Sequence, residues 1–243
     1  MSDSRLPDDR SFAARRFTVE APTFLHMLMP NIPPYVSYSW LAMLLLIVPA
    51  LLIRNKLALV PSGLQNVMET FAEFFLNMAN TSIGHHWGET FYPLLGTLGL
   101  YILVSNLFGL VPGFESPTSN INATASMAIP VFLATHYYGI KVHGFKYLNH
   151  FVGPIRNIYA LPLMIMMFFI ELIGHLVRPV TLSVRLFGNM VAKHIILVVL
   201  AVLAPLLVPT LILALGTLVS LIQAYVFVLL TTLYLAGAVE EGH

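Results

Sequence analysis

The side chains best suited to moving an ion lie together in one apolar stretch, residues 158–202. Charged groups inside a membrane segment are costly, and they usually mark an ion pathway or a paired site. At about 100° per residue, most of the polar groups here fall within about 80° of helical arc. This side carries Glu171, His175, Arg178, Leu182, Arg185, Asn189 and Lys193, whereas His194 points the opposite way. We therefore predict a polar stripe that faces protein or water rather than lipid.

Arg185 is the residue of this stripe that is hardest to explain structurally. It lies near the middle of the 158–202 stretch, and no carboxylate occurs within two helical turns of it. A guanidinium stays protonated at any relevant pH. Arg185 therefore suits the role of a fixed charge that passing ions or carboxylates must meet, and it needs a partner from elsewhere.

The other residues of the stripe leave structural interpretations open. Arg178 and Lys193 could simply extend their charged ends to a membrane interface. Glu171 could form a structural cluster with His175 or Arg178. The Glu171–His175 spacing also fits two metal ligands on one helix, but without a third nearby it makes a poor metal site. We predict no metal and no cofactor, and the sequence has no phosphate-binding loop or nucleophile elbow.

The composition identifies lipid as the solvent of most of the chain. Of the 243 residues, 58% are hydrophobic and 9% are charged, whereas a soluble domain carries about 25% charged residues. Alternating apolar and polar residues are not seen, which makes a β-barrel improbable. The net charge of +1 argues against a nucleic-acid partner. The absence of cysteine excludes disulfides, cysteine-ligated zinc and iron–sulfur clusters.

The chain divides into a mixed-charge N-terminal tail, 1–35, and a single membrane domain, 36–243. No cleaved signal peptide is expected, because the start lacks an apolar segment. We predict an all-α integral membrane protein with five transmembrane helices and one amphipathic helix on the membrane surface. The spans are expected at about 36–53, 91–111, 121–140, 158–202 and 209–238, and the amphipathic helix at about 62–84.

Loop charges predict how the chain is oriented. Basic residues follow the first and third spans: Arg54, Lys56, Lys141, Lys146 and Arg156. The loops after the second and fourth spans carry none, so the positive-inside rule puts the N-terminus outside and the C-terminus in the cytoplasm.

The last two helices are too long for simple crossings. A straight helix over 158–202 would extend about 65–70 Å, against a hydrocarbon core of about 30 Å. The segment must tilt steeply, break at Pro162 or Pro179, or project from the membrane. We expect the two helices to form a long tilted hairpin.

Three motifs, in order, resemble subunit a of the F-type ATP synthase membrane sector. The most specific is Arg178-Pro-Val-Thr-Leu-Ser-Val-Arg185-Leu-Phe-Gly-Asn189-Met190. Ser105-Asn106-Leu-Phe-Gly-Leu-Val-Pro112 is similar to the end of the second span in that family, and Gln223-Ala-Tyr-Val-Phe-Val-Leu-Leu-Thr231 to its last helix. The resemblance covers nearly everything after residue 36.

The resemblance implies a stator subunit with two proton half-channels that faces the rotor c-ring. Arg185 matches the essential arginine, Gln223 the glutamine near it and Asn189 the asparagine one turn along. Glu171 matches an acid of the cytoplasmic-side channel and His194 a position on the other channel. We also assign His175 and Asn106 to the half-channels. The implied partners are protons, the c-ring, b-type peripheral stalk subunits and the bilayer of the bacterial inner membrane.

Three positions depart from the family pattern. Lys193 stands where a small residue is usual, and Gly216 and Gly109 stand where relatives can carry an acid. These departures concern the non-cytoplasmic half-channel. The alternative functions are a stand-alone transporter or channel and an intramembrane metalloenzyme. A stand-alone transporter would be expected to contain a second copy of the 171–194 charge pattern. A metalloenzyme would be expected to contain a metal-ligand motif. Neither is found. The chain would be a non-catalytic subunit without a nucleotide site.

Overall fold

The computed structural model describes residues 31–54, 57–111, 113–144, 161–203 and 207–240. Most of the predicted N-terminal tail, the loop residues Lys146 and Arg156, and the turn at Pro205 lie outside this part of the chain. The described residues form long helices and no strand, which confirms the predicted all-α fold. The elements are α3 (Pro34–Arg54), α4 (Leu64–Ile83), α5 (His85–Phe108), the 3-10 turn η1 (Pro117–Ser119), α6 (Ile121–His143), α8 (Leu161–Leu203) and α9 (Leu207–Val239).

Four of the described helices are long and apolar enough to cross a membrane: α3, α5, α8 and α9. The fifth predicted span is α6, whose 23 residues would extend about 34 Å. It is less apolar because it carries polar residues such as Thr124, Thr135 and His136. The predicted second span begins earlier than expected, at His85, since Gly84 alone separates it from α4. Gly84 has a φ of 88°, a backbone conformation that glycine adopts without strain.

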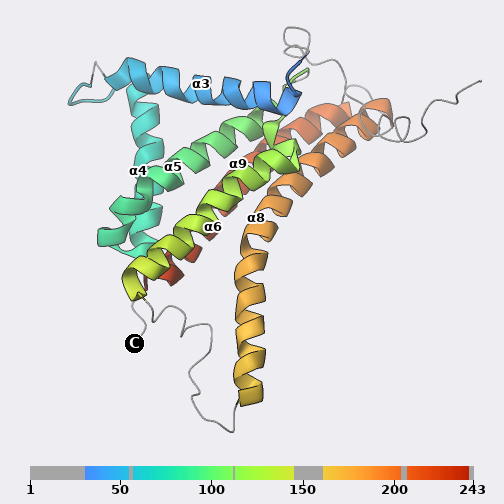
Figure 1. The fold of residues 1–243 in the computed structure, drawn as a ribbon. Coiled ribbons are helices and arrows are strands. Elements are labelled where there is room, and N and C mark those ends of the chain that lie inside the picture. The colour runs from blue at the N-terminus through green and yellow to red at the C-terminus, as the bar shows by residue number, and fades with distance from the viewer. Residues whose placement is uncertain (1–30, 55–56, 112, 145–160, 204–206, 241–243) are drawn as a thin grey trace, which may run out of the picture.

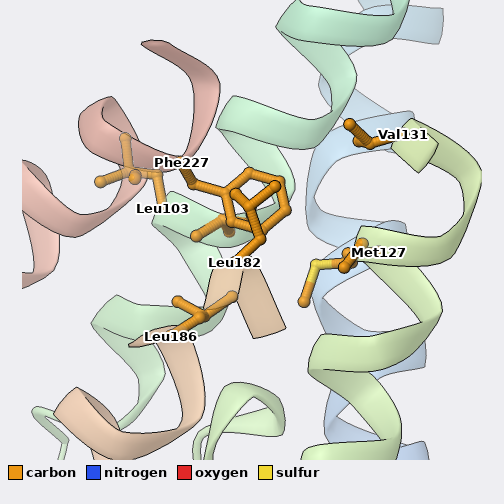
Figure 2. Packing of buried hydrophobic residues seen from close by; sticks show 9 residues of the cluster. Leu103, Met127, Val131, Leu182, Leu186 and Phe227 are labelled. Carbon is orange, nitrogen blue, oxygen red and sulfur yellow. The ribbon is translucent and has the colours of Figure 1, made fainter. Parts of the chain in front are cut away.

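The helices α5, α6 and α9 lie alongside one another, and α8 joins them with its second part (Figure 1). The shared core contains Leu103 of α5, Met127 and Val131 of α6, Leu182 and Leu186 of α8 and Phe227 of α9 (Figure 2). In lipid, such contacts stabilise the bundle chiefly through close packing, because the surroundings are equally apolar.

The amphipathic helix α4 packs against the bundle as well as presenting an outer face. Phe75 and Ala79 are buried against α5 and α9. The fit at Phe75 depends on Gly99, because a Cβ there would lie 2.4 Å from the Phe75 Cζ atom. Gln65, although polar, is buried and bonds the backbone of Ala58. Whether α4 lies on the membrane surface stays a prediction.

The predicted hairpin is formed by α8 and α9. Helix α8 has 43 residues, about 65 Å at the standard rise. It bends part-way along, and its first part stands apart from the other helices (Figure 1). Pro179 lies inside α8 and cannot donate a backbone hydrogen bond to the carbonyl four residues before it, a common cause of such bends. The length of α8 is therefore divided between two parts that point in different directions (Figure 1).

Candidate functional site

The polar stripe of α8 runs along the edge where this helix meets α6 and α9. His175 and Leu182 are buried, whereas Arg178 and Lys193 are half-buried. Arg185 and Asn189 are exposed, so the middle of the stripe opens toward the surroundings of the isolated chain. The stripe is thus covered by protein at its two ends and uncovered at Arg185.

Arg185 has no hydrogen bond or ion pair with any residue in the described part of the chain. Its backbone is nevertheless firmly placed, because the next residue, Leu186, is fully buried in the core. A guanidinium has five N–H donors, and leaving them unpaired at membrane depth is costly. The Arg185 guanidinium is therefore available to a partner of opposite charge.

Asn189 and Gln223, both assigned from the sequence to the site of Arg185, are in contact. Asn189 Nδ2 donates to Gln223 Oε1 at 2.5 Å. Gln223 is 4% exposed, so this bond satisfies a buried amide and ties α8 to α9 one turn from Arg185. Arg185 itself is not bonded to Gln223.

A first polar cluster lies before Arg185 on α8. His175 Nε2 is 3.2 Å from Glu171 Oε1, and its ring centroid is 5.2 Å from that of His136 on α6. Arg178 lies 5.2 Å from the centre of the Tyr234 ring of α9. A cavity of about 10 Å³ between these helices is lined by His136, His175 and Arg178, among others, and has room for about one water molecule.

Sequence reasoning missed His136. Its position within the predicted span 121–140 was the available signal, because an ionisable residue inside a membrane segment is a candidate functional residue. The structure shows that α6 brings it against His175. No group of three His, Cys, Asp or Glu side chains in the described residues could hold a metal ion.

A second polar cluster lies beyond Arg185, between η1, α5 and α9. Thr118 Oγ1 donates to Asn106 Oδ1 at 2.7 Å, and the hydroxyls of Ser116 and Thr118 are also 2.7 Å apart. Asn106 Nδ2 donates to the Ser220 carbonyl at 3.4 Å. All four residues are fully buried. Buried polar groups this well connected form a rigid network, which runs from the loop before α6 to α9.

Lys193 and His194 adjoin this network at positions where glycines leave room. Lys193 Nζ donates to the Asn106 carbonyl and to Ser220 Oγ, each at 3.3 Å. A Cβ on Gly216 would lie 3.1 Å from Lys193 Cδ, and one on Gly109 would lie 3.1 Å from His194 Nε2. His194 Nε2 is buried and has no hydrogen-bond partner among the described residues. Two of the departures from the family pattern are thus matched to side chains of α8. The missing side chain at Gly216 leaves room for Lys193, and the missing side chain at Gly109 leaves room for His194.

The two clusters flank Arg185 along α8, and residues 36–236 match the family described as ATP synthase A chain. The chain belongs to this family. Similar proteins named ATP synthase subunit a include those of Trichlorobacter lovleyi and Geotalea uraniireducens, each 51% identical over 86% of this chain and 88% of the relative. The protein of that name from Geobacter sulfurreducens is 49% identical over the same shares.

Membership of the ATP synthase A chain family confirms the resemblance seen in the motifs. It accords with the apolar helices of a multi-pass membrane protein.

Proposed function

We propose that this chain is the stator subunit that couples proton flow to rotation of the c-ring in an ATP synthase. Arg185 meets the carboxylate of each rotor subunit in turn, and the two clusters on α8 belong to separate half-channels. The observation that supports this most strongly is the position of an exposed Arg185, unpaired among the described residues, between two polar clusters. His175 lies ten residues before it and Lys193 eight residues after it, about 15 Å and 12 Å along the helix.

The physical mechanism follows from the cost of charge in lipid. A protonated rotor carboxylate is neutral and can face lipid, whereas an ionised one cannot do so without a large penalty. The permanent positive charge of Arg185 favours the ionised form while a carboxylate passes. The same charge repels a proton that would cross directly at mid-depth. Net proton movement therefore requires the ring to carry the carboxylate from one half-channel to the other.

Each cluster supplies groups that can pass protons. Glu171, His175 and His136 would serve the half-channel on the side where α8 begins. Asn106, Ser116 and Thr118, with His194, would serve the half-channel on the side of η1. The loop charges favour a cytoplasmic location for the first side and a non-cytoplasmic location for the second. In this arrangement the C-terminus is cytoplasmic, and b-type stalk subunits hold the chain beside the ring.

The role of Arg185 can be tested by substitution in the assembled complex. We predict that Arg185→Ala abolishes proton-driven ATP synthesis in energised vesicles while the complex still assembles. Arg185→Lys should support little ATP synthesis, because an ammonium lacks the planar fork of a guanidinium and can lose its proton when desolvated. Arg54→Ala, at the exposed end of α3, is the matched control and should synthesise normally. Normal synthesis in either Arg185 variant would refute the proposal.

A further inference from the structure

Two buried hydroxyls join α6 to α8 close to Arg185. Ser183 Oγ of α8 lies 2.9 Å from Thr124 Oγ1 of α6, and the two residues are 5% and 0% exposed. Thr124 donates its own proton to the Ile121 carbonyl at 3.1 Å, so its lone pairs accept the proton of Ser183. The bond therefore spans two helices, and its α8 end lies two residues before Arg185 in the chain.

The α6 end of this bond belongs to a well-anchored segment. Thr124 lies in the first turn of α6, which begins at Ile121, and its backbone N–H donates to the Asn120 carbonyl at 3.2 Å. The Asn120 side chain caps the helix by accepting from the Asn122 N–H at 2.9 Å. The preceding turn, η1, is part of the second polar cluster. Thr124 is therefore a fixed point against which α8 can be aligned.

The α8 end of the bond lies just beyond the bend. Pro179 cannot donate to the carbonyl of His175, four residues before it, so backbone bonding across the bend is incomplete. Thr181 Oγ1 bonds the Val177 and Arg178 carbonyls of its own helix, a pattern that also bends helices. The part of α8 after the bend is thus weakly oriented by its own backbone, and contacts with α6 must orient it.

Ser183 and Arg185 point to opposite sides of α8. Two residues correspond to about 200° of helical rotation, and Ser183 is buried whereas Arg185 is exposed. Leu182 and Leu186 lie in the core that α8 shares with α6 (Figure 2). Apolar contacts of this kind are non-directional, whereas a hydrogen bond requires its atoms within narrow limits of distance and angle. The hydroxyl pair therefore selects one rotation of α8.

We propose that Ser183 and Thr124 are positioning residues, whose hydrogen bond fixes the rotation of α8 that presents Arg185 to the rotor carboxylates. This rests on the proposed function, which assigns Arg185 to that encounter. Ser183 acts through the backbone of α8 and does not touch the reacting groups. Without the bond, the part of α8 after Pro179 adopts several rotations, and only some of them place the guanidinium against a passing carboxylate.

Substitutions that remove the bond test this in the assembled complex. Ser183→Ala leaves no buried donor unpaired, because Thr124 keeps its bond to the Ile121 carbonyl. We expect proton-driven ATP synthesis per assembled complex to fall about tenfold, less than the roughly 100-fold that a misplacement of about 1 Å can cost. Thr124→Val should have the same effect, and the double variant no further one, because both changes remove the same bond. Thr124→Ser keeps the hydroxyl and should retain the wild-type rate.

Thr135→Val is the matched control. Thr135 is also a buried threonine of α6, 4% exposed, but its hydroxyl donates to the Val131 carbonyl of the same helix at 2.8 Å. It should leave the rate unchanged. A nitroxide on Val180→Cys, exposed just after the bend, reports the rotation of α8 independently of activity, since the chain has no other cysteine. We expect one motional component in this labelled chain and with Thr135→Val, and a second component with Ser183→Ala.

The outcomes distinguish this inference from the proposed function. Wild-type synthesis and a single spectral component in Ser183→Ala would overturn it. Less subunit in the complex with an unchanged rate per complex would do so too, because the pair would then only stabilise packing. If Ser183→Ala does not assemble, Thr124→Val and Thr124→Ser decide, and equal rates in these two would contradict positioning by the hydroxyl. Synthesis in Arg185→Ala would refute the function itself, whereas its loss beside a normal Ser183→Ala would refute this inference alone.

Discussion

At the scale of single residues, the site combines an unpaired charge with neighbours whose hydrogen bonds are satisfied. Asn189, Gln223 and Asn106 all have partners on other helices, so their positions are fixed by contacts within the chain. Fixed dipoles and charges at membrane depth need little rearrangement when charge passes, which favours repeated proton transfer. Each of these residues belongs to one of the three motifs identified in the sequence. The fit of Lys193 to Gly216 could not be predicted, because it depends on how three helices approach one another.

His194 provides a residue-scale test that also probes the orientation of the chain. An imidazole titrates near neutral pH and can take up or release a proton. We predict that His194→Leu slows proton-driven synthesis, most strongly when the non-cytoplasmic side is alkaline and protons there are scarce. His86→Leu, exposed at the start of α5, is the control. Synthesis rates would be followed in vesicles with the pH varied on one side at a time. A defect that follows the cytoplasmic pH instead would reverse the assigned sides.

At the scale of helices, periodicity and apolar length predicted most elements within a few residues, because both follow from the helical repeat and the bilayer thickness. The errors arose where tertiary contacts decide. Helix α5 begins at His85 rather than near residue 91 because it packs along α4 from its first turns. Gln65 is buried because the segment before α4 folds back onto it. Helical periodicity alone contains no information about either contact.

The contact between α4 and α5 gives a prediction at this scale. Gly99→Ala would place a Cβ 2.4 Å from Phe75 Cζ and 3.0 Å from Val228 Cγ2. Overpacking of this kind costs about 1–3 kcal/mol, so we expect less subunit in assembled complexes and faster proteolysis near α4. Adding Phe75→Leu should recover part of the loss. Gly237→Ala in α9, with nothing within 4 Å of the added carbon, is the control. Equal yields of Gly99→Ala and Gly237→Ala would show that α4 does not pack this way.

At the scale of the whole molecule, the bent hairpin of α8 and α9 leaves one face of α8 uncovered. Val177, Val180 and Val184 are each about half exposed, and Arg185 lies beside this apolar surface. An apolar face with one central charge suits a ring of apolar helices that each carry one carboxylate. The sequence predicted an overlong hairpin from length alone. It did not predict which face stays open, because that depends on the packing of α5, α6 and α9 against the other side.

A cross-linking experiment tests whether this face meets the rotor. The chain has no cysteine, so single cysteines can be introduced without background. Thr181→Cys lies on the exposed face one turn from Arg185, and Leu44→Cys on α3 is also exposed and serves as the control. The partner would be a rotor subunit with one cysteine beside its carboxylate. We predict a disulfide with Thr181→Cys and none with Leu44→Cys. Cross-linking through Leu44→Cys, with none through Thr181→Cys, would contradict the proposal that Arg185 faces the rotor carboxylates.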